Sequence, residues 1–168
     1  MGAFSAKHGK NALFYCETFS FKYNRVKRSG RSPLHVGIIY SSEKKVIEKL
    51  AAELKKGLEE QHHTVFMYAD SANNFRGIAG CRYFMIGSYA TAAFKPKTPT
   101  RLAAALHKVP GIAGKKSIAF MPRSVMGERK ALIALMNDME KQGCVLIDQR
   151  AFGSEKEAYE FGRTISLK

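Results

Sequence analysis

Short apolar runs alternate with stretches of helical periodicity along residues 34–168. Residues 36–40 form an apolar run, which is typical of a strand buried on both faces of a sheet. Ser41 and Ser42 follow this run, and we expect them to provide the N-cap of a helix. The helix is indicated by apolar residues that recur at helical spacing opposite Lys and Glu, namely Val46, Ile47, Leu50, Ala51, Leu54 and Leu58.

The same alternation continues to the end of the chain. Further apolar runs predict strands at residues 64–68, 83–86, 117–121 and 144–147. Helical spacing predicts helices over residues 100–109 (with Thr98 or Thr100 as N-cap), 128–142 and 154–165. Strands that alternate with helices require right-handed crossovers and a parallel sheet covered on both faces, so the fold class is α/β. Ligands of such sheets bind beyond the carboxyl ends of the strands, which points to loops 41–45, 87–99 and 122–127.

Residues 1–33 differ from the rest and are predicted to form a basic N-terminal extension to the domain at 34–168. Residues 11–24 mix aromatic and polar positions with some alternation, which predicts a strand or an extended segment lying on the domain. Residues 25–33 are basic and rich in chain-breaking residues, as in a linker.

The formal net charge of +14 narrows the range of partners. Residues 1–33 hold seven Lys and Arg against one acid, Glu17, and residues 34–168 hold 21 against 13, so the excess is spread as +6 and +8. A basic surface favours anionic partners such as nucleic acid, acidic proteins or phosphorylated ligands. A basic surface that only maintains solubility explains the charge equally well. Because no recognised nucleic-acid motif accompanies the charge, nucleic acid is the least favoured partner.

Other function classes lack the residues that they need. No apolar run approaches the ~20 residues of a membrane span, and the N-terminus has no signal-peptide pattern. Cys16, Cys81 and Cys144 make no metal spacing and are expected to be small buried side chains in a cytoplasmic protein. No nucleophile–base–acid set is visible, so neither catalytic residues nor a metal site is assigned, and enzyme activity stays open.

The loops distinguish among the α/β families. The first loop has no GxGxxG pattern of a dinucleotide-binding domain, and the third strand does not end in the Asp of a response regulator. Residues 84–89 with 96–106, residues 115–120 with Gly127 and Glu128, and residues 142–147 resemble the third, fourth and fifth strand regions of flavodoxins. The resemblance covers about residues 34–168. It implies a flavodoxin-like three-layer sandwich with a five-stranded parallel sheet in the order 2-1-3-4-5.

The resemblance also implies a site for FMN. The phosphate would contact the first loop, the ring would lie against aromatic side chains, and backbone groups after the third strand would line its polar edge. The residues in those places are Ser41, Ser42, Lys44, Lys45, Gly87, Ser88, Tyr89, Ala90, Phe94, Pro122 and Arg123. The first loop departs from the family pattern S/T-x-T-G-x-T, because Lys44, Lys45 and Ile47 stand at its second Thr, Gly and last Thr.

Two functions therefore remain open. The leading hypothesis is FMN-dependent electron transfer, with Ser41, Ser42 and the two lysines holding the phosphate. The second is a flavodoxin-fold module without a cofactor, which binds an acidic or phosphorylated partner through its basic face. In that second case, Ser41 and Ser42 only begin a helix, and Tyr89 and Phe94 only anchor their loop. An acidic redox or regulatory protein is the expected partner, and the oligomeric state is not predicted.

Overall fold

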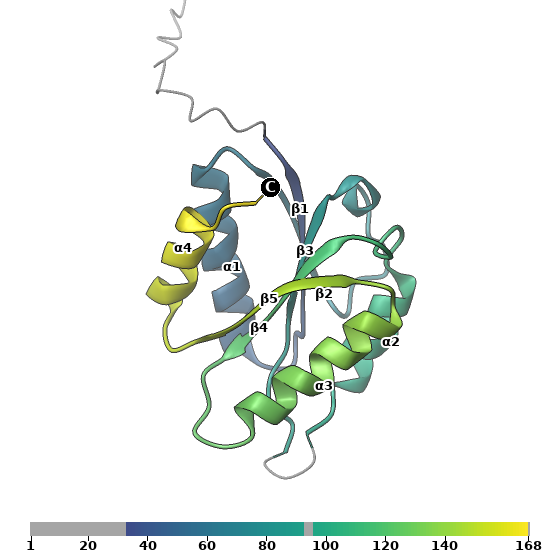
Figure 1. Ribbon diagram of the computed structural model, residues 1–168, viewed down its shortest axis with the longest axis vertical. Helices are drawn as coiled ribbons and strands as arrows, with labels where there is room; N and C mark the ends of the chain where they lie inside the picture. Colours follow the sequence, from purple (N-terminus) through teal and green to yellow (C-terminus); the bar gives the residue numbers. More distant parts are fainter. Residues whose placement is uncertain (1–32, 93–95, 168) are drawn as a thin grey trace, which may run out of the picture. The chain divides into compact units, whose positions relative to one another are not determined.

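Five parallel strands form one sheet in the order β2-β1-β3-β4-β5 (Figure 1). The computed structural model describes residues 33–92 and 96–167, and the extension predicted for residues 1–33 therefore lies almost entirely outside the described residues. The strands are β1 (His35–Tyr40), β2 (Thr64–Ala69), β3 (Tyr83–Gly87), β4 (Lys116–Pro122) and β5 (Val145–Phe152). The predicted fold class and strand order are confirmed.

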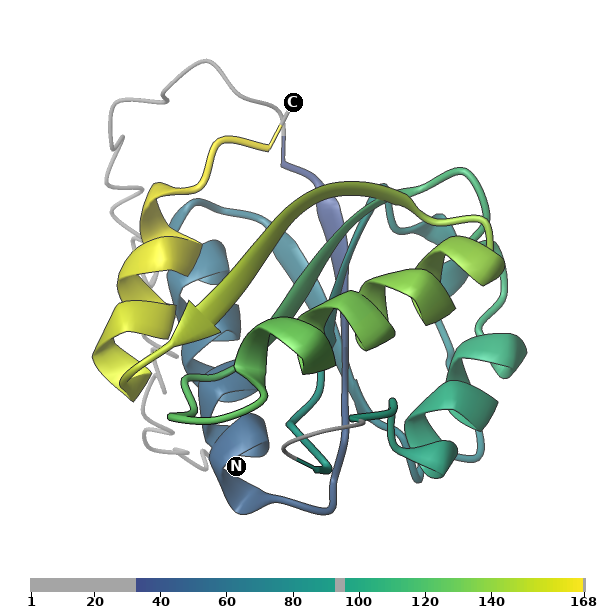
Figure 2. The ribbon, with the colours of Figure 1, turned by 60° about the horizontal axis from the view of Figure 1, so that its bottom comes forward.

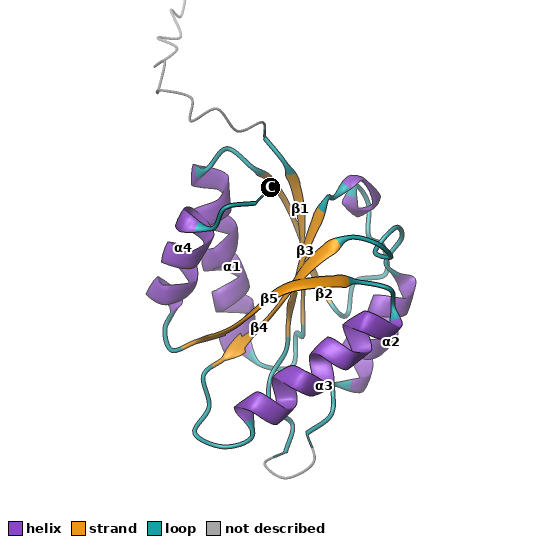
Figure 3. Cartoon of the chain, viewed as in Figure 1, coloured by secondary structure: helices purple, strands orange, loops and turns teal. Residues whose placement is uncertain are grey.

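Helices cover both faces of this sheet. They are α1 (Lys45–Glu60), α2 (Thr100–Lys108), α3 (Glu128–Lys141) and α4 (Glu155–Thr164), with one short 3₁₀ helix, η1 (Ile78–Gly80), between β2 and β3. α1 and α4 lie side by side on one face, whereas α2 and α3 lie on the other (Figures 2 and 3). The loops after β1, β3 and β4 gather at the lower end of the sheet in Figure 1, as expected for the carboxyl ends of parallel strands.

The buried face of α1 explains why its sequence folds against the sheet. Ile47, Leu50 and Leu54 are almost fully buried and pack with Val36 and Ile38 of β1. Val46, which the periodicity placed on the same face, is 44% exposed. That prediction is wrong because Val46 lies at the margin of the stripe that faces the sheet, about 100° around the helix axis from Ile47.

β5 is longer than its apolar run predicts. The strand continues to Phe152 through polar residues, because it lies at the edge of the sheet and has a neighbour, β4, on one side only. Its pairing with β4 shifts between the pairs Ser117–Leu146 and Ile118–Asp148, which leaves Ile147 as an extra residue. The apolar-run criterion finds central strands and misses the outer half of this edge strand.

α1 and α4 approach each other closely at two glycines. A Cβ atom on Gly162 would lie 2.6 Å from the Leu54 carbonyl oxygen, and one on Gly57 would lie 2.7 Å from the Arg163 nitrogen. The Gln61 amide then donates to the carbonyl oxygens of Gly162 and Ile165, at 2.8 and 3.0 Å. Only residues without a side chain allow the two backbones to come this close.

Within the described part of the chain, no helix is both long enough and apolar enough to cross a bilayer. Cys81 and Cys144 are buried free thiols, as expected, and burial raises the pKa of Cys81 to about 11. Cys16 lies outside the described residues.

Candidate functional site

The loop after β1 runs from Ser41 to Lys44 and leads directly into α1. Lys44 occupies the N-cap position, and no side chain there bonds a helix N–H group. The prediction that Ser41 and Ser42 cap the helix is therefore wrong. The predicted caps of α2 are wrong as well, because Pro99 holds that position without a side-chain bond.

Ser41 and Ser42 bind the carboxylate of Asp70 instead. The Ser42 N–H and hydroxyl groups donate to Asp70 Oδ1 at 3.0 and 2.7 Å, and the Ser41 hydroxyl donates to Oδ2 at 3.2 Å. Asp70 directly follows β2, and its own N–H donates to the Tyr40 carbonyl oxygen at 2.8 Å. A carboxylate that is only 7% exposed needs such partners, so this serine pair braces the ends of β1 and β2 against each other.

This geometry does not reproduce a phosphate cradle. The hydroxyls of Ser41 and Ser42, predicted to hold the phosphate, already donate to Asp70, as does the Ser42 N–H group. Ile47 is fully buried in the core, where the family pattern has a hydroxyl. The only non-glycine residue of the described chain with positive φ is His62, so residues 41–45 contain no left-handed residue that would form a backbone nest. Ser41, Ser42 and Ile47 therefore do not form the cradle expected for a flavin phosphate. Of the side chains predicted to hold the phosphate, only those of Lys44 and Lys45 have no hydrogen bond or ion pair to a described residue.

Tyr89 connects the loop after β3 to the loop after β1. Its hydroxyl donates to the Glu43 carboxylate, and the Lys44 ammonium lies 5.8 Å from the centre of its ring. The hydrogen bond to Glu43 and, to a lesser extent, burial raise the pKa of Tyr89 to about 12. The ring is therefore held against the first loop by contacts within the chain.

The residues that end β3 have structural partners. Gly87 lies under the ring of Phe120, where a Cβ atom would come within 2.6 Å of Cε2. The Gly87 carbonyl oxygen accepts from the Ser41 N–H and the Ser88 N–H donates to the Phe120 carbonyl oxygen, both at 3.0 Å. Two of the backbone groups predicted to line a flavin edge, the Gly87 carbonyl and the Ser88 N–H, thus bond within the chain. Ala90 packs against the core on the α2–α3 side.

The loop after β4 begins with residues that contact β5 and α4. Pro122 ends β4 and is half-buried. The Arg123 N–H donates to the Phe152 carbonyl oxygen at 2.7 Å, and its guanidinium pairs with Glu157 at 3.2 Å. These contacts engage Arg123 within the chain. Phe94 lies outside the described residues, so its predicted role stays a prediction.

In the loops after β1, β3 and β4 and the helix starts that follow them, most cations have no ion pair within the described residues; Arg123, which pairs with Glu157, is the exception. Three acids accept hydrogen bonds within the chain: Asp70 from the two serines, Glu43 from Tyr89, and Glu128 from the Ser124 N–H at 2.9 Å. Glu48, in the first turn of α1, is exposed and has no hydrogen bond or ion pair to a described residue. In the loop after β1, the loop after β3 and the first turns of α1, α2 and α3, the exposed cations without an ion pair to any described residue are Lys44, Lys45, Lys97, Arg101, Arg129 and Lys130. We call these six residues the basic face.

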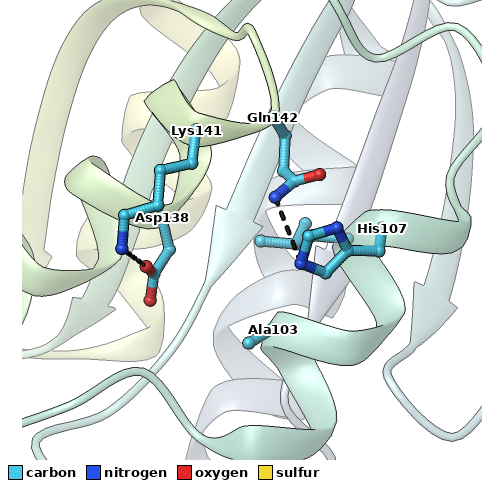
Figure 4. Close-up of a pocket in the computed structure, with 6 residues that line it drawn as sticks. Ala103, His107, Asp138, Lys141 and Gln142 are labelled. Carbon is cyan, nitrogen blue, oxygen red and sulfur yellow. Dashed lines mark hydrogen bonds and ion pairs between the residues drawn. The ribbon is translucent and has the colours of Figure 1, made fainter.

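Two cavities lie beside α3, one against α2 and the other against the segment that precedes α2. One, of about 220 Å³, is lined by the C-terminal ends of the two helices, where His107 and Gln142 approach within 3.4 Å (Figure 4). The other, of about 370 Å³, shares Asp138 and Lys141 with it and reaches residues 96–98. Neither is lined by Ser41, Ser42 or Tyr89.

The Asp138 carboxylate in these cavities accepts from the Lys141 ammonium at 2.8 Å. Desolvation raises its pKa, but the hydrogen bond from Lys141, the nearby Thr98 hydroxyl and the charges of Lys141 and His107 outweigh that effect, so the pKa lies below its usual value. No group of three or more His, Cys, Asp and Glu side chains in the described residues is arranged to hold a metal.

Asp70 is the residue of this region that the sequence analysis missed. Its signal is an acidic residue placed immediately after the second predicted strand, at the sheet edge where Ser41 and Ser42 follow the first. A buried acid at that position would be expected to take donors from a neighbouring loop.

Comparison with known proteins supports the fold, whereas the chemistry of the site is argued from its own residues. No protein-family model and no curated protein matches the sequence. Among solved structures, the chain is similar to the two-electron-reduced flavodoxin of Megasphaera elsdenii (17% identity, TM-score 0.57), covering 76% of this chain and 96% of that one. Flavodoxin 1 of Bacillus cereus gives 14% identity and a TM-score of 0.57, covering 79% and 99%.

A third similar structure is a mutant flavodoxin of Fusobacterium nucleatum bound to flavin mononucleotide. It is 12% identical and has a TM-score of 0.51, and the match covers 68% of this chain and 68% of that one. At these identities the likeness establishes a flavodoxin-like fold.

Proposed function

We propose that this chain is a flavodoxin-fold binding module that works without a flavin and binds an acidic or phosphorylated protein partner through its basic face. The observation that carries the proposal is the division of charges at the carboxyl end of the sheet. Asp70, Glu43 and Glu128 accept hydrogen bonds within the chain, whereas the six cations of the basic face are exposed and have no described ion-pair partner. Such a face attracts anions and repels other basic proteins.

Helix polarity strengthens the positive potential of this end. The N-termini of α1, α2 and α3 follow the carboxyl ends of β1, β3 and β4, and each helix end carries a partial positive charge of ~0.5. Lys45, Arg101 and Arg129 lie in these first turns, and α2 has no acidic residue in its own. A cation in that position is unfavourable by itself and becomes favourable when an anionic partner lies nearby.

A fluorescein-labelled polyglutamate peptide tests the proposal by fluorescence anisotropy with the full chain. Binding is expected to weaken steeply as salt rises, because the attraction is between exposed charges. The double variant Lys97→Glu and Arg101→Glu should weaken binding at least about tenfold. The matched control, Arg82→Glu with Lys108→Glu, makes the same charge change at the opposite end of the sheet and should have a much smaller effect. Equal losses in both variants would show that net charge alone, and no particular face, governs binding.

The alternative function is FMN-dependent electron transfer in a cytoplasmic flavoprotein. Its support is the fold shared with flavodoxins, including the structure bound to flavin mononucleotide. Absorbance of the purified protein at the flavin bands and quenching of added FMN fluorescence separate the two functions. A protein that carries FMN, or that quenches it stoichiometrically, would replace our proposal with this alternative.

A further inference from the structure

The turn between β4 and α3 exposes two apolar side chains. Val125 is fully exposed and Met126 is 61% exposed, whereas β4 and α3 on either side contribute buried side chains to the core. Single exposed apolar residues are common on protein surfaces, but two adjacent ones at the tip of a turn form a small apolar projection. We call these two residues the apolar tip.

Hydrogen bonds hold this turn in shape. The Ser124 N–H donates to the Glu128 carboxylate at 2.9 Å, and the Ser124 hydroxyl donates to the Met126 carbonyl oxygen at 3.0 Å. The N–H of Arg123 is tied to β5, and Gly127 enters α3 with φ of +77°. The apolar tip is thus presented by a turn that needs little ordering when a partner binds, which favours affinity.

Cations flank the apolar tip. Arg129 and Lys130 lie in the first turn of α3, are exposed, and belong to the basic face. Glu128, the acid between the tip and these cations, has its carboxylate engaged by Ser124. An apolar projection beside available cations is complementary to an acidic surface that contains apolar side chains or a small apolar recess.

We infer that Val125 and Met126 are the apolar anchor with which the basic face binds its partner, and that the partner segment is an acidic peptide with interspersed apolar side chains. This inference rests on the function proposed above and specifies its partner. An anionic bilayer fits less well. The tip offers only two apolar side chains and no aromatic, which is little apolar surface for insertion into a bilayer.

Two labelled acidic peptides of equal length and charge test the inference with the full chain. One carries Leu, and the other Ser, at the same positions between glutamates. We expect the Leu peptide to bind at least about tenfold more tightly, because the tip buries apolar surface only against Leu. The variant Val125→Ser with Met126→Ser should bind both peptides equally, with the affinity for the Ser peptide unchanged. The control Val145→Ser with Ile147→Ser changes two exposed apolar residues of β5 and should keep the difference.

The outcomes separate this inference from the proposed function. If the wild-type chain binds both peptides equally, the apolar anchor is refuted and the basic face stands. If it binds neither peptide, both proposals fail. Vesicles of phosphatidylcholine and phosphatidylserine provide the third arm. Vesicle binding that is lost in the Val125→Ser, Met126→Ser variant, without discrimination between the peptides, would assign the tip to a bilayer and overturn the inference.

Discussion

Replacement of Asp70 tests whether its carboxylate braces the first two strands. Asp70→Ala removes the acceptor of three hydrogen bonds. The Ser41 side chain is fully buried, so its hydroxyl loses its partner without access to water, at a cost of about 1–3 kcal/mol. Ser42 is half-buried and recovers part of its bonding from water, which adds about 1 kcal/mol. We expect a total loss of about 2–4 kcal/mol in the free energy of unfolding.

Asp70→Asn provides the matched control. An amide has the same shape, retains one acceptor oxygen for Ser42, and places an N–H group where the Ser41 hydroxyl accepts it. The expected loss is therefore below about 1.5 kcal/mol. Equilibrium unfolding in urea measures both variants, with the m-value checking that the folded and unfolded states stay comparable. If Asp70→Ala and Asp70→Asn both lie within about 0.5 kcal/mol of the wild type, the brace does not stabilise the fold.

Three further predictions follow from contacts elsewhere in the molecule. Gly162→Ala should destabilise the protein by about 1–3 kcal/mol despite the better helix propensity of Ala, because the new methyl group meets the α1 backbone; thermal unfolding measures the loss. The pKa of Tyr89 is raised in the folded state, so its contribution to stability is full below pH ~10 and falls as pH rises towards 12. Tyr89→Phe should therefore reduce the loss of stability at alkaline pH, measured by unfolding titrations. An unchanged pH profile would contradict the hydrogen bond to Glu43. The pKa of Asp138 is lowered in the folded state, so its contribution to stability is present above pH ~4 and is lost as pH falls further. The difference in the free energy of unfolding between the wild type and Asp138→Asn should therefore shrink in acid. A difference that stays constant with pH would refute the pairing with Lys141.

Local pattern was sufficient for most of the sheet because its central strands are buried on both faces. β1 and β3 appear in the sequence as uninterrupted apolar runs for that reason. β5 has one neighbour, so its second half tolerates Asp148, Gln149 and Arg150, and the apolar run ends before the strand does. A strand buried on both faces is recognisable in the sequence as an apolar run, whereas the exposed part of an edge strand is not.

The candidate site was predictable in its location but less so in its bonds. Parallel topology brings the loops after β1, β3 and β4 together, as the alternation of elements implies. The partner of Ser42, however, is 28 residues away in sequence, and a serine before a helix has the same local pattern whether it caps the helix or binds Asp70. The pairing of Arg123 with Glu157 is likewise set by tertiary structure. The sequence pattern predicts at which end of the sheet a polar group lies, but the tertiary structure determines which neighbour it bonds.

The contact between α1 and α4 has a consequence for folding during synthesis. Because the chain is made from its N-terminus, α1 is synthesised long before α4. The two helices are linked by a hydrogen bond from Gln61 to a residue 101 positions later in the chain. Until α4 is made, Leu54, Leu58 and the glycine surface of α1 lack the helix that covers them in the native state. The nascent chain therefore exposes apolar surface over most of its elongation, and its final closure depends on a contact of high sequence separation.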